Sequence, residues 1–178
     1  MMITRGARAL VTFALTLQAA CSFSVVVTGA TGYLGCEIVH QLVESGAAVT
    51  AVVRDASRAS HLGAGLRVVE CDLSAKDGQA RFEAVLRGIP NSQDGKVGEE
   101  DPHHHHYVIN TAAVFTKDFE DAELELVQPT IAIAENVARA CAECGPWVKR
   151  LVHTSSMAAV RDPRQAPQFG PAYTSADW

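Results

Sequence analysis

The sequence predicts one α/β domain built on a parallel five-stranded sheet with helices on both faces. Its composition, 48% hydrophobic and 20% charged over 178 residues, is that of a globular domain with a sizeable core. Short apolar runs of strand length alternate along the chain with longer segments of helical period. The runs are continuous, which is typical of parallel strands covered on both sides.

The first strand, a glycine turn and the first helix are predicted within residues 24–45. Ser24 to Thr28 (SVVVT) is a β-branched run that favours a strand. Three glycines follow, and between Glu37 and Ser45 three apolar residues recur at helical spacing, namely Ile38, Leu42 and Val43. Gly46 stands where this helix is expected to end.

The later elements repeat this alternation. Strands are predicted at 48–53, 66–71, 107–110 and 148–153, and helices at 79–87 and 129–144. The residues expected to face inward are Phe82, Val85 and Leu86 in the first of these helices, and Ile131, Ala134, Ala138 and Cys141 in the second. Right-handed crossovers between parallel strands predict the strand order 3-2-1-4-5.

Three segments differ in composition from the domain predicted at 24–160. Residues 1–23 combine a basic start with an apolar run, so they are either a targeting peptide or an over-extended start. A targeting peptide implies the secretory pathway or an organelle, and its absence implies the cytoplasm. Residues 89–106 form a polar insertion ending in four adjacent histidines, which cannot all converge on one metal ion. Residues 161–178 are expected to be a loop.

The charge and the cysteine content exclude some classes of function and partner. Fifteen Lys and Arg against twenty Asp and Glu give a net charge of -5 without a basic stripe, so nucleic acid is not an expected partner. A membrane span is not expected either, because the apolar stretch at 9–30 ends in a predicted strand and turn. The five cysteines indicate buried thiols, including the CxxC of Cys141 and Cys144 at a helix end. His153 is expected to be a packed strand residue.

The turn after the first strand carries the main functional signal. Thr28 to Gly35 reads TGATGYLG, which places three glycines between a strand and a helix. Such glycines let the backbone approach a pyrophosphate, and the helix N-terminus offers free N–H groups to it. This pattern predicts a Rossmann-like, doubly wound dinucleotide-binding domain.

The ends of the second and third strands bear on which dinucleotide binds. An acid at the end of the second strand accepts the ribose hydroxyls of NAD, whereas an arginine pairs with the extra phosphate of NADP. Arg54 precedes Asp55 and Arg58 is near, so NADP is the expected cofactor and NAD the alternative. A solvated charge pair is the other interpretation of Arg54 and Asp55. Asp72 either meets the adenine edge or caps the following helix.

Several motifs together resemble the extended short-chain dehydrogenase/reductases, also called the NAD-dependent epimerase/dehydratase family. They are VVVTGATGYLG, AVVRD, ECDL, NTAAV and VKRLVHTSSMAAV, and the resemblance covers about residues 24–178. Within the family the sequence is most similar to the dihydroflavonol reductase and cinnamoyl-CoA reductase types, through QPTIAIAENVARACAECG and YTSADW. The 3β-hydroxysteroid dehydrogenases are near relatives.

The resemblance implies a role for each matching residue. The pyrophosphate would be held by Gly29, Thr31, Gly32, Tyr33, Leu34 and Gly35. The rest of the cofactor would meet Arg54 at the 2′-phosphate, Asp72 and Leu73 at the adenine, and Thr111, Ala112 and Ala113 at the nicotinamide. Ser156 would hydrogen-bond the substrate carbonyl or hydroxyl, with Ser155 as the less favoured candidate.

The sequence departs from the family at its acid/base centre. The family uses a Tyr-x-x-x-Lys pair, in which the lysine lowers the tyrosine pKa. No such pair occurs here, since Tyr173 is followed four places later by Asp177. The sixth and seventh strands and the substrate-binding region are not found either. We therefore expect the N-terminal part of such an enzyme, inactive alone.

Three functions remain open. The first is the cofactor-binding part of an NADP-dependent oxidoreductase that interconverts a carbonyl and an alcohol on a small hydrophobic substrate. The second is a non-catalytic NADP(H)-binding protein, and the third is part of a nucleotide-sugar epimerase/dehydratase or a 3β-hydroxysteroid dehydrogenase-type enzyme. A sheet ending at the fifth strand has an apolar edge, so a partner chain covering it is also expected.

Overall fold

The computed structural model describes residues 24–88 and 106–156. The expectations for residues 1–23, for the insertion at 89–105 and for the segment after Ser156 lie outside the described residues. Within them the strands are β1 (Ser24–Thr28), β2 (Ala48–Val53), β3 (Arg67–Glu70), β4 (His106–Asn110) and β5 (Val148–His153). The helices are α2 (Tyr33–Glu44), α3 (Gly78–Leu86) and α4 (Gln128–Glu143), with a 3-10 turn at Ala56–Leu62 and a π-helical turn at Glu123–Val127.

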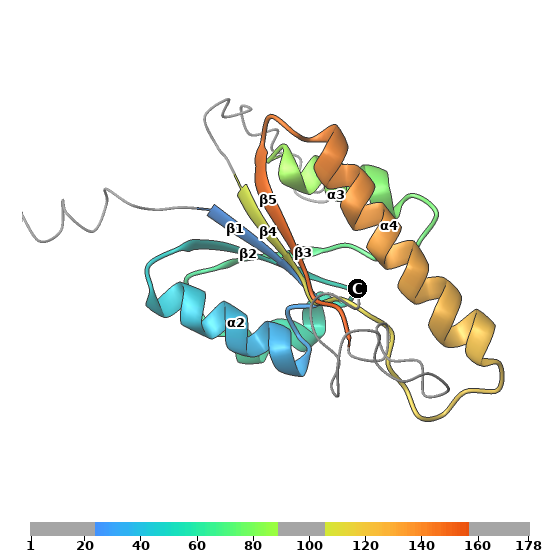
Figure 1. The fold of residues 1–178 in the computed structure, drawn as a ribbon. Coiled ribbons are helices and arrows are strands. Elements are labelled where there is room, and N and C mark those ends of the chain that lie inside the picture. The colour runs from blue at the N-terminus through green and yellow to red at the C-terminus, as the bar shows by residue number, and fades with distance from the viewer. Residues whose placement is uncertain (1–23, 89–105, 157–178) are drawn as a thin grey trace, which may run out of the picture.

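The five strands form one parallel sheet in the order β3-β2-β1-β4-β5, as predicted. Helix α2 covers one face, and α3 and α4 lie together on the other (Figure 1). Alternate residues of β1 divide between two cores: Val25 and Val27 pack on the α2 side, and Val26 on the α3 and α4 side. Both faces of the central strands are therefore buried, which explains their continuous apolar runs.

The bounds of five predicted elements need correction, and two of these, α3 and α4, start and end only one residue earlier than the predicted 79–87 and 129–144. Helix α2 begins at Tyr33, four residues earlier than expected, so Gly35 lies in its first turn. Strand β3 is one residue shorter at each end than the predicted 66–71, and β4 begins at His106. The two short helical turns at 56–62 and 123–127 were not predicted.

The inner face predicted for α4 is confirmed at Cys141, which is buried, and was wrong at Ile131 and Ala138. Ile131 is 46% exposed and Ala138 is exposed, whereas the side chains that face the core are Ile133, Val137, Ala140 and Cys141. Both sets have helical spacing, so periodicity alone does not separate them. Packing against α3 and the sheet selects the second set. The inward residues predicted for α3 are confirmed, because Phe82, Val85 and Leu86 are all buried.

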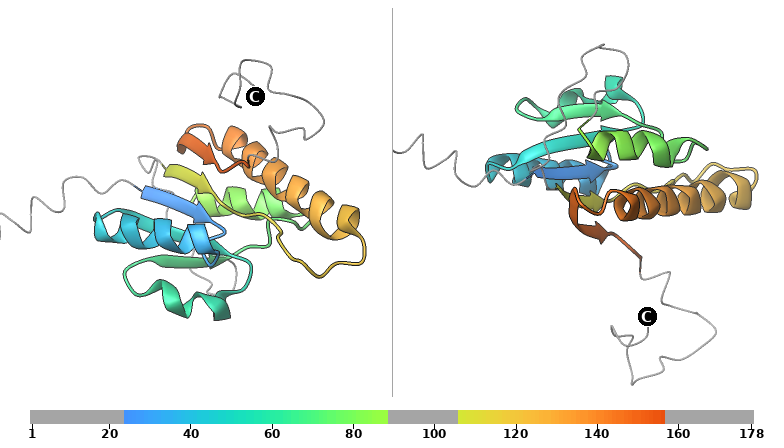
Figure 2. Two further views of the ribbon diagram at one scale, coloured as in Figure 1. Left: turned by 60° about the horizontal axis from the view of Figure 1, so that its bottom comes forward. Right: turned by 90° about the horizontal axis from the view of Figure 1, so that it is seen from above.

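Strand β5 is an edge of the sheet within the described residues, as Figure 2 shows. Val152 pairs in register with Ile109 on the α2 side and is 50% exposed, and Tyr107 on β4 is 37% exposed. Helix α2 covers β1 and β2 but does not reach this part of the sheet. An apolar strip on β4 and β5 is therefore open to solvent on the α2 side.

Candidate functional site

The loops at the carboxyl ends of the first four strands surround one cavity of about 570 Å³. Parallel strands bring these loops to the same edge of the sheet, where open α/β sheets bind ligands. Most of the predicted site residues line it, namely Gly29, Thr31, Gly32, Arg54, Asp72, Leu73, Thr111, Ala112 and Ala113. Tyr33, Leu34, Gly35 and Ser156 are not among the lining residues, whereas the unpredicted Ser74, Val114, Phe115 and Thr116 are.

The glycine turn between β1 and α2 has no room for larger side chains. Gly29 has φ of 67°, and a Cβ there would lie 2.7 Å from the Ala112 backbone nitrogen. A Cβ on Gly35 would lie 2.2 Å from the Gly29 carbonyl oxygen, which already accepts a hydrogen bond from the Gly32 N–H at 2.9 Å. Both glycines are therefore required by close approach of the backbone. Gly35 acts as support behind the turn, which explains why it lies outside the cavity lining.

The N-terminus of α2 is open at this turn. Its first residue is Tyr33, whose side chain is fully exposed, and no side chain caps the helix or places an acid in its first turn. The first N–H groups of a helix have no partner within the helix, and the helix dipole favours an anion beside them. The turn can therefore receive a phosphate group.

Two arginines stand at the β2 side of the cavity. Arg54 and Arg58 line it, and neither forms an ion pair with the described part of the chain. Asp55 caps the turn at 56–62 by accepting the backbone N–H of Ser57 at 2.9 Å and its hydroxyl at 2.6 Å. These hydrogen bonds lower the pKa of the Asp55 carboxyl. The guanidinium groups are thus available to an anionic ligand.

Asp72 shapes the turn after β3 and does not cap a helix, because α3 starts only at Gly78. Its carboxylate accepts the Ser74 hydroxyl at 2.6 Å and the Ser74 N–H at 3.0 Å, and these bonds lower its pKa. The carboxylate is therefore held ionised at the cavity wall beside the buried Leu73.

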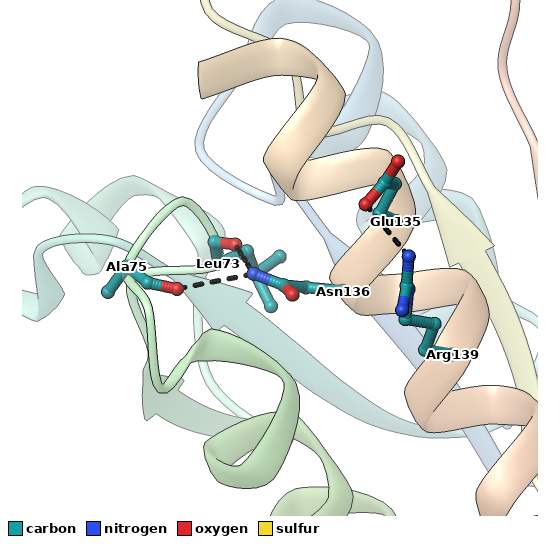
Figure 3. A network of polar contacts seen from close by, with 5 residues as sticks. All are labelled: Leu73, Ala75, Glu135, Asn136 and Arg139. Atoms are coloured by element: carbon teal, nitrogen blue, oxygen red, sulfur yellow. Dashed lines mark hydrogen bonds and ion pairs between the residues drawn. The ribbon is translucent and has the colours of Figure 1, made fainter. Parts of the chain in front are cut away.

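Asn136 of α4 ties this turn to the rest of the domain (Figure 3). Its side-chain amide donates to the carbonyl oxygens of Leu73 at 2.9 Å and Ala75 at 3.2 Å. Glu135 and Arg139, drawn in the same figure, form an exposed ion pair with each other at 3.1 Å. Sequence reasoning missed Asn136; the available signal was a polar residue between Ile133 and Val137 on the buried face of a helix.

A second buried polar group organises the end of β4. Asn110 is 1% exposed, and its Oδ1 accepts the Thr28 hydroxyl at 2.5 Å and the Ala112 N–H at 3.1 Å. Thr111 donates its hydroxyl to the Thr28 carbonyl oxygen at 2.7 Å. These bonds fix the segment 111–113 against the glycine turn, from the opposite side of the cavity to Arg54.

The end of β5 lies beside β4 but outside the cavity. The Thr154 N–H donates to the Asn110 carbonyl oxygen at 2.9 Å, and Ser155 and Ser156 are exposed. The expectation that His153 is packed was wrong: it is exposed, and its Nδ1 lies 2.8 Å from the Asn110 side-chain nitrogen. His153 lies on a strand with a neighbour on one side only, and the sequence pattern did not reveal that this strand is at the edge of the described sheet.

The predicted buried thiols are confirmed for three of the cysteines. Cys71, Cys141 and Cys144 are buried, Cys36 is half-buried, and Cys21 lies outside the described residues. Burial raises the pKa of both Cys71 and Cys141 to about 11. The CxxC therefore lacks the thiolate character of a redox motif. Among the helices of the described residues, none is both long and apolar enough to cross a membrane.

Comparison with known proteins agrees with this geometry. Residues 29–176 match the NAD(P)H-binding family. A dihydroflavonol 4-reductase from Hordeum vulgare is 33% identical over 154 residues, which are 86% of this chain and 40% of that protein. A cinnamoyl-CoA reductase from Medicago truncatula is 33% identical over 143 residues, 76% of this chain and 38% of that protein. The chain thus spans about 40% of the length of these curated relatives.

Solved structures show the same architecture. The Gre2 protein of Candida albicans, crystallised with NADPH, matches with a TM-score of 0.61 and 25% identity over 82% of this chain and 40% of that one. The yeast methylglyoxal/isovaleraldehyde reductase Gre2 matches with a TM-score of 0.63 and 24% identity, over 81% of this chain and 40% of that one.

Proposed function

Because this chain belongs to the NAD(P)H-binding family, with reductases of the extended short-chain dehydrogenase/reductase type as its homologues, we propose that it binds NADPH in preference to NADH for the reduction of a carbonyl compound. The observation that carries the proposal is the placement of Arg54, without an ion-pair partner in the described residues, in the cavity that also contains the glycine turn. Bound NADPH would supply the hydride.

The described residues fit such a cofactor at several points. The pyrophosphate would lie at the glycine turn, where Gly29 and Gly35 allow a close backbone and α2 presents its N-terminus. Arg54, with Arg58 beside it, would bind the 2′-phosphate. Asp72 and Leu73 would meet the adenine, and the segment 111–113 the nicotinamide.

The remaining assignments rest on the same proposal. Ser156 would position the substrate oxygen from the end of β5, although it lies outside the cavity lining. The dinucleotide-binding domain would comprise residues 24–160. Another polypeptide segment would cover the apolar strip on β4 and β5, a proposal supported by the exposure of Val152 and Tyr107.

Replacing Arg54 with alanine tests the choice of cofactor. Loss of a charge-assisted bond to the 2′-phosphate is expected to weaken NADPH binding roughly 10- to 100-fold. NADH binding should change less than twofold, because NADH has no phosphate there. Dissociation constants from fluorescence titration provide the measurement, with Arg139→Ala on the exposed side of α4 as the matched control. Equal losses for NADPH and NADH would contradict the proposed phosphate contact.

A further inference from the structure

Three strand ends meet at the side chain of Asn110. Its Oδ1 accepts the Thr28 hydroxyl from β1 and the Ala112 N–H from the segment after β4, at 2.5 and 3.1 Å. Its Nδ2 lies 2.8 Å from Nδ1 of His153 on β5. Asn110 is 1% exposed, whereas His153 is exposed to solvent. A buried amide therefore connects a solvent-accessible imidazole to the wall of the dinucleotide cavity.

The backbone determines the orientation of this amide. The Ala112 N–H is a donor, so it must face the amide oxygen and not the amide nitrogen. The nitrogen Nδ2 then points to His153 and donates to Nδ1. This hydrogen bond forms only with the imidazole tautomer whose Nδ1 carries a lone pair and whose proton is on Nε2.

We propose that His153 is a positioning residue for the dinucleotide site, and that its protonation weakens dinucleotide binding by displacing the Asn110 amide. The inference rests on the proposed function. A protonated imidazole presents an N–H to the Nδ2–H of Asn110, so two donors face each other. If His153 turns away, a buried donor loses its partner; if the amide rotates, the Ala112 N–H loses its acceptor. Either change is unfavourable, and rotation of the amide also loosens the segment 111–113, because the Ala112 N–H then lacks its acceptor.

Register places His153 on the α4 side of the sheet, where α4 presents the apolar Ile133 and Val137 to the core. The charged residues of α4 nearest these, Glu135 and Arg139, pair with each other and are exposed.

The two basic residues of β5 lie on the opposite face of the sheet or well along the strand from His153. On β5, Arg150 pairs in register with Tyr107 on the opposite face, and Lys149 is four residues away, about 13 Å along the strand. In the segment before α4, the carboxylates of Asp121 and Glu125 accept backbone N–H groups of that segment.

The experiment compares the wild-type chain with His153→Gln, which keeps an acceptor for Asn110 but does not titrate. Affinities for NADP⁺ and NAD⁺ are measured by calorimetry at about pH 8 and about pH 5.5, the range that spans histidine protonation. We expect the wild type to lose about three- to tenfold more affinity than His153→Gln between these values. The 2′-phosphate of NADP⁺ also titrates here, but it affects both proteins alike and is absent from NAD⁺.

A third variant and a fold control complete the test. His153→Phe removes the acceptor, so its affinity should be low and its extra pH dependence absent. Circular dichroism at both pH values confirms that each chain is folded. If the wild type and His153→Gln lose affinity equally for both dinucleotides, the inference is wrong while the proposed function stands. If the wild type binds neither dinucleotide at about pH 8, the proposed function is wrong and the inference falls with it.

Discussion

Adding one methyl group at Gly35 should destabilise the domain although Gly35 does not line the cavity. A Cβ there would lie 2.2 Å from the Gly29 carbonyl oxygen and 2.8 Å from the Thr111 hydroxyl. Neither neighbour can move freely, because the carbonyl accepts the Gly32 N–H and the hydroxyl donates to the Thr28 carbonyl oxygen. The turn must shift by about 1 Å, and overpacking of this kind costs about 3 kcal/mol of unfolding free energy.

Gly32→Ala is the matched comparison. Its Cβ would meet only the Gly29 carbonyl oxygen, at 3.2 Å, and its φ of -77° suits any residue. We expect less than about 1 kcal/mol of destabilisation from Gly32→Ala. Both variants should bind NADPH at least roughly tenfold more weakly, because both alter the turn proposed to hold the pyrophosphate. Urea unfolding and fluorescence titration measure the two effects. A Gly35→Ala chain as stable as the wild type, or no more destabilised than Gly32→Ala, would refute the steric argument.

Two further predictions follow from buried polar and thiol groups. Asn136→Ala should lower the unfolding free energy by about 1–3 kcal/mol, because the carbonyl groups of Leu73 and Ala75 lose the donor that we call the Asn136 clamp. Glu135→Gln on the same helix should change the unfolding free energy by less than about 0.5 kcal/mol. Similar losses for the two variants in urea unfolding would contradict a stabilising role for the clamp. Cys71 and Cys141 have pKa values raised from 9.0 to about 11, so the stability that they contribute is complete below pH 9.0 and is lost as pH rises towards about 11. The unfolding temperature should therefore fall less steeply between pH 8 and about 11 for Cys141→Ala than for the wild type. Equal slopes of unfolding temperature against pH for the two proteins would contradict the raised pKa.

The sequence was most informative where local chemistry and tertiary packing agree. The boundaries predicted for β1, β2 and β5 match the structure, and for β1 and β2 this is because each is a mainly apolar run ended by a glycine or an arginine. The start of α2 was missed because Gly35 is a poor helix former. It is helical here since only glycine fits behind the turn.

The candidate site could be predicted through its loops but not through its supports. The glycines, Arg54 and Asp72 follow predicted strands, so a parallel sheet brings them together without further knowledge. Asn136 and His153 contact polar partners 63 and 43 residues away in the chain, and no local pattern reveals such pairings. The buried face of α4 was predicted only in part for the same reason, because packing against α3 and the sheet decides which of its residues are buried.

The Asn136 clamp has a consequence for the nascent chain. During synthesis Leu73 leaves the ribosome 63 residues before Asn136, a delay of roughly 3 to 13 seconds at ordinary elongation rates. The glycine turn likewise lacks the hydrogen bond from the Thr111 hydroxyl to the Thr28 carbonyl oxygen until Thr111 has been synthesised. Until α4 has emerged and docked, the turn after β3 lacks the donor that holds its carbonyl groups, so the cofactor cavity is completed only after α4 has been synthesised.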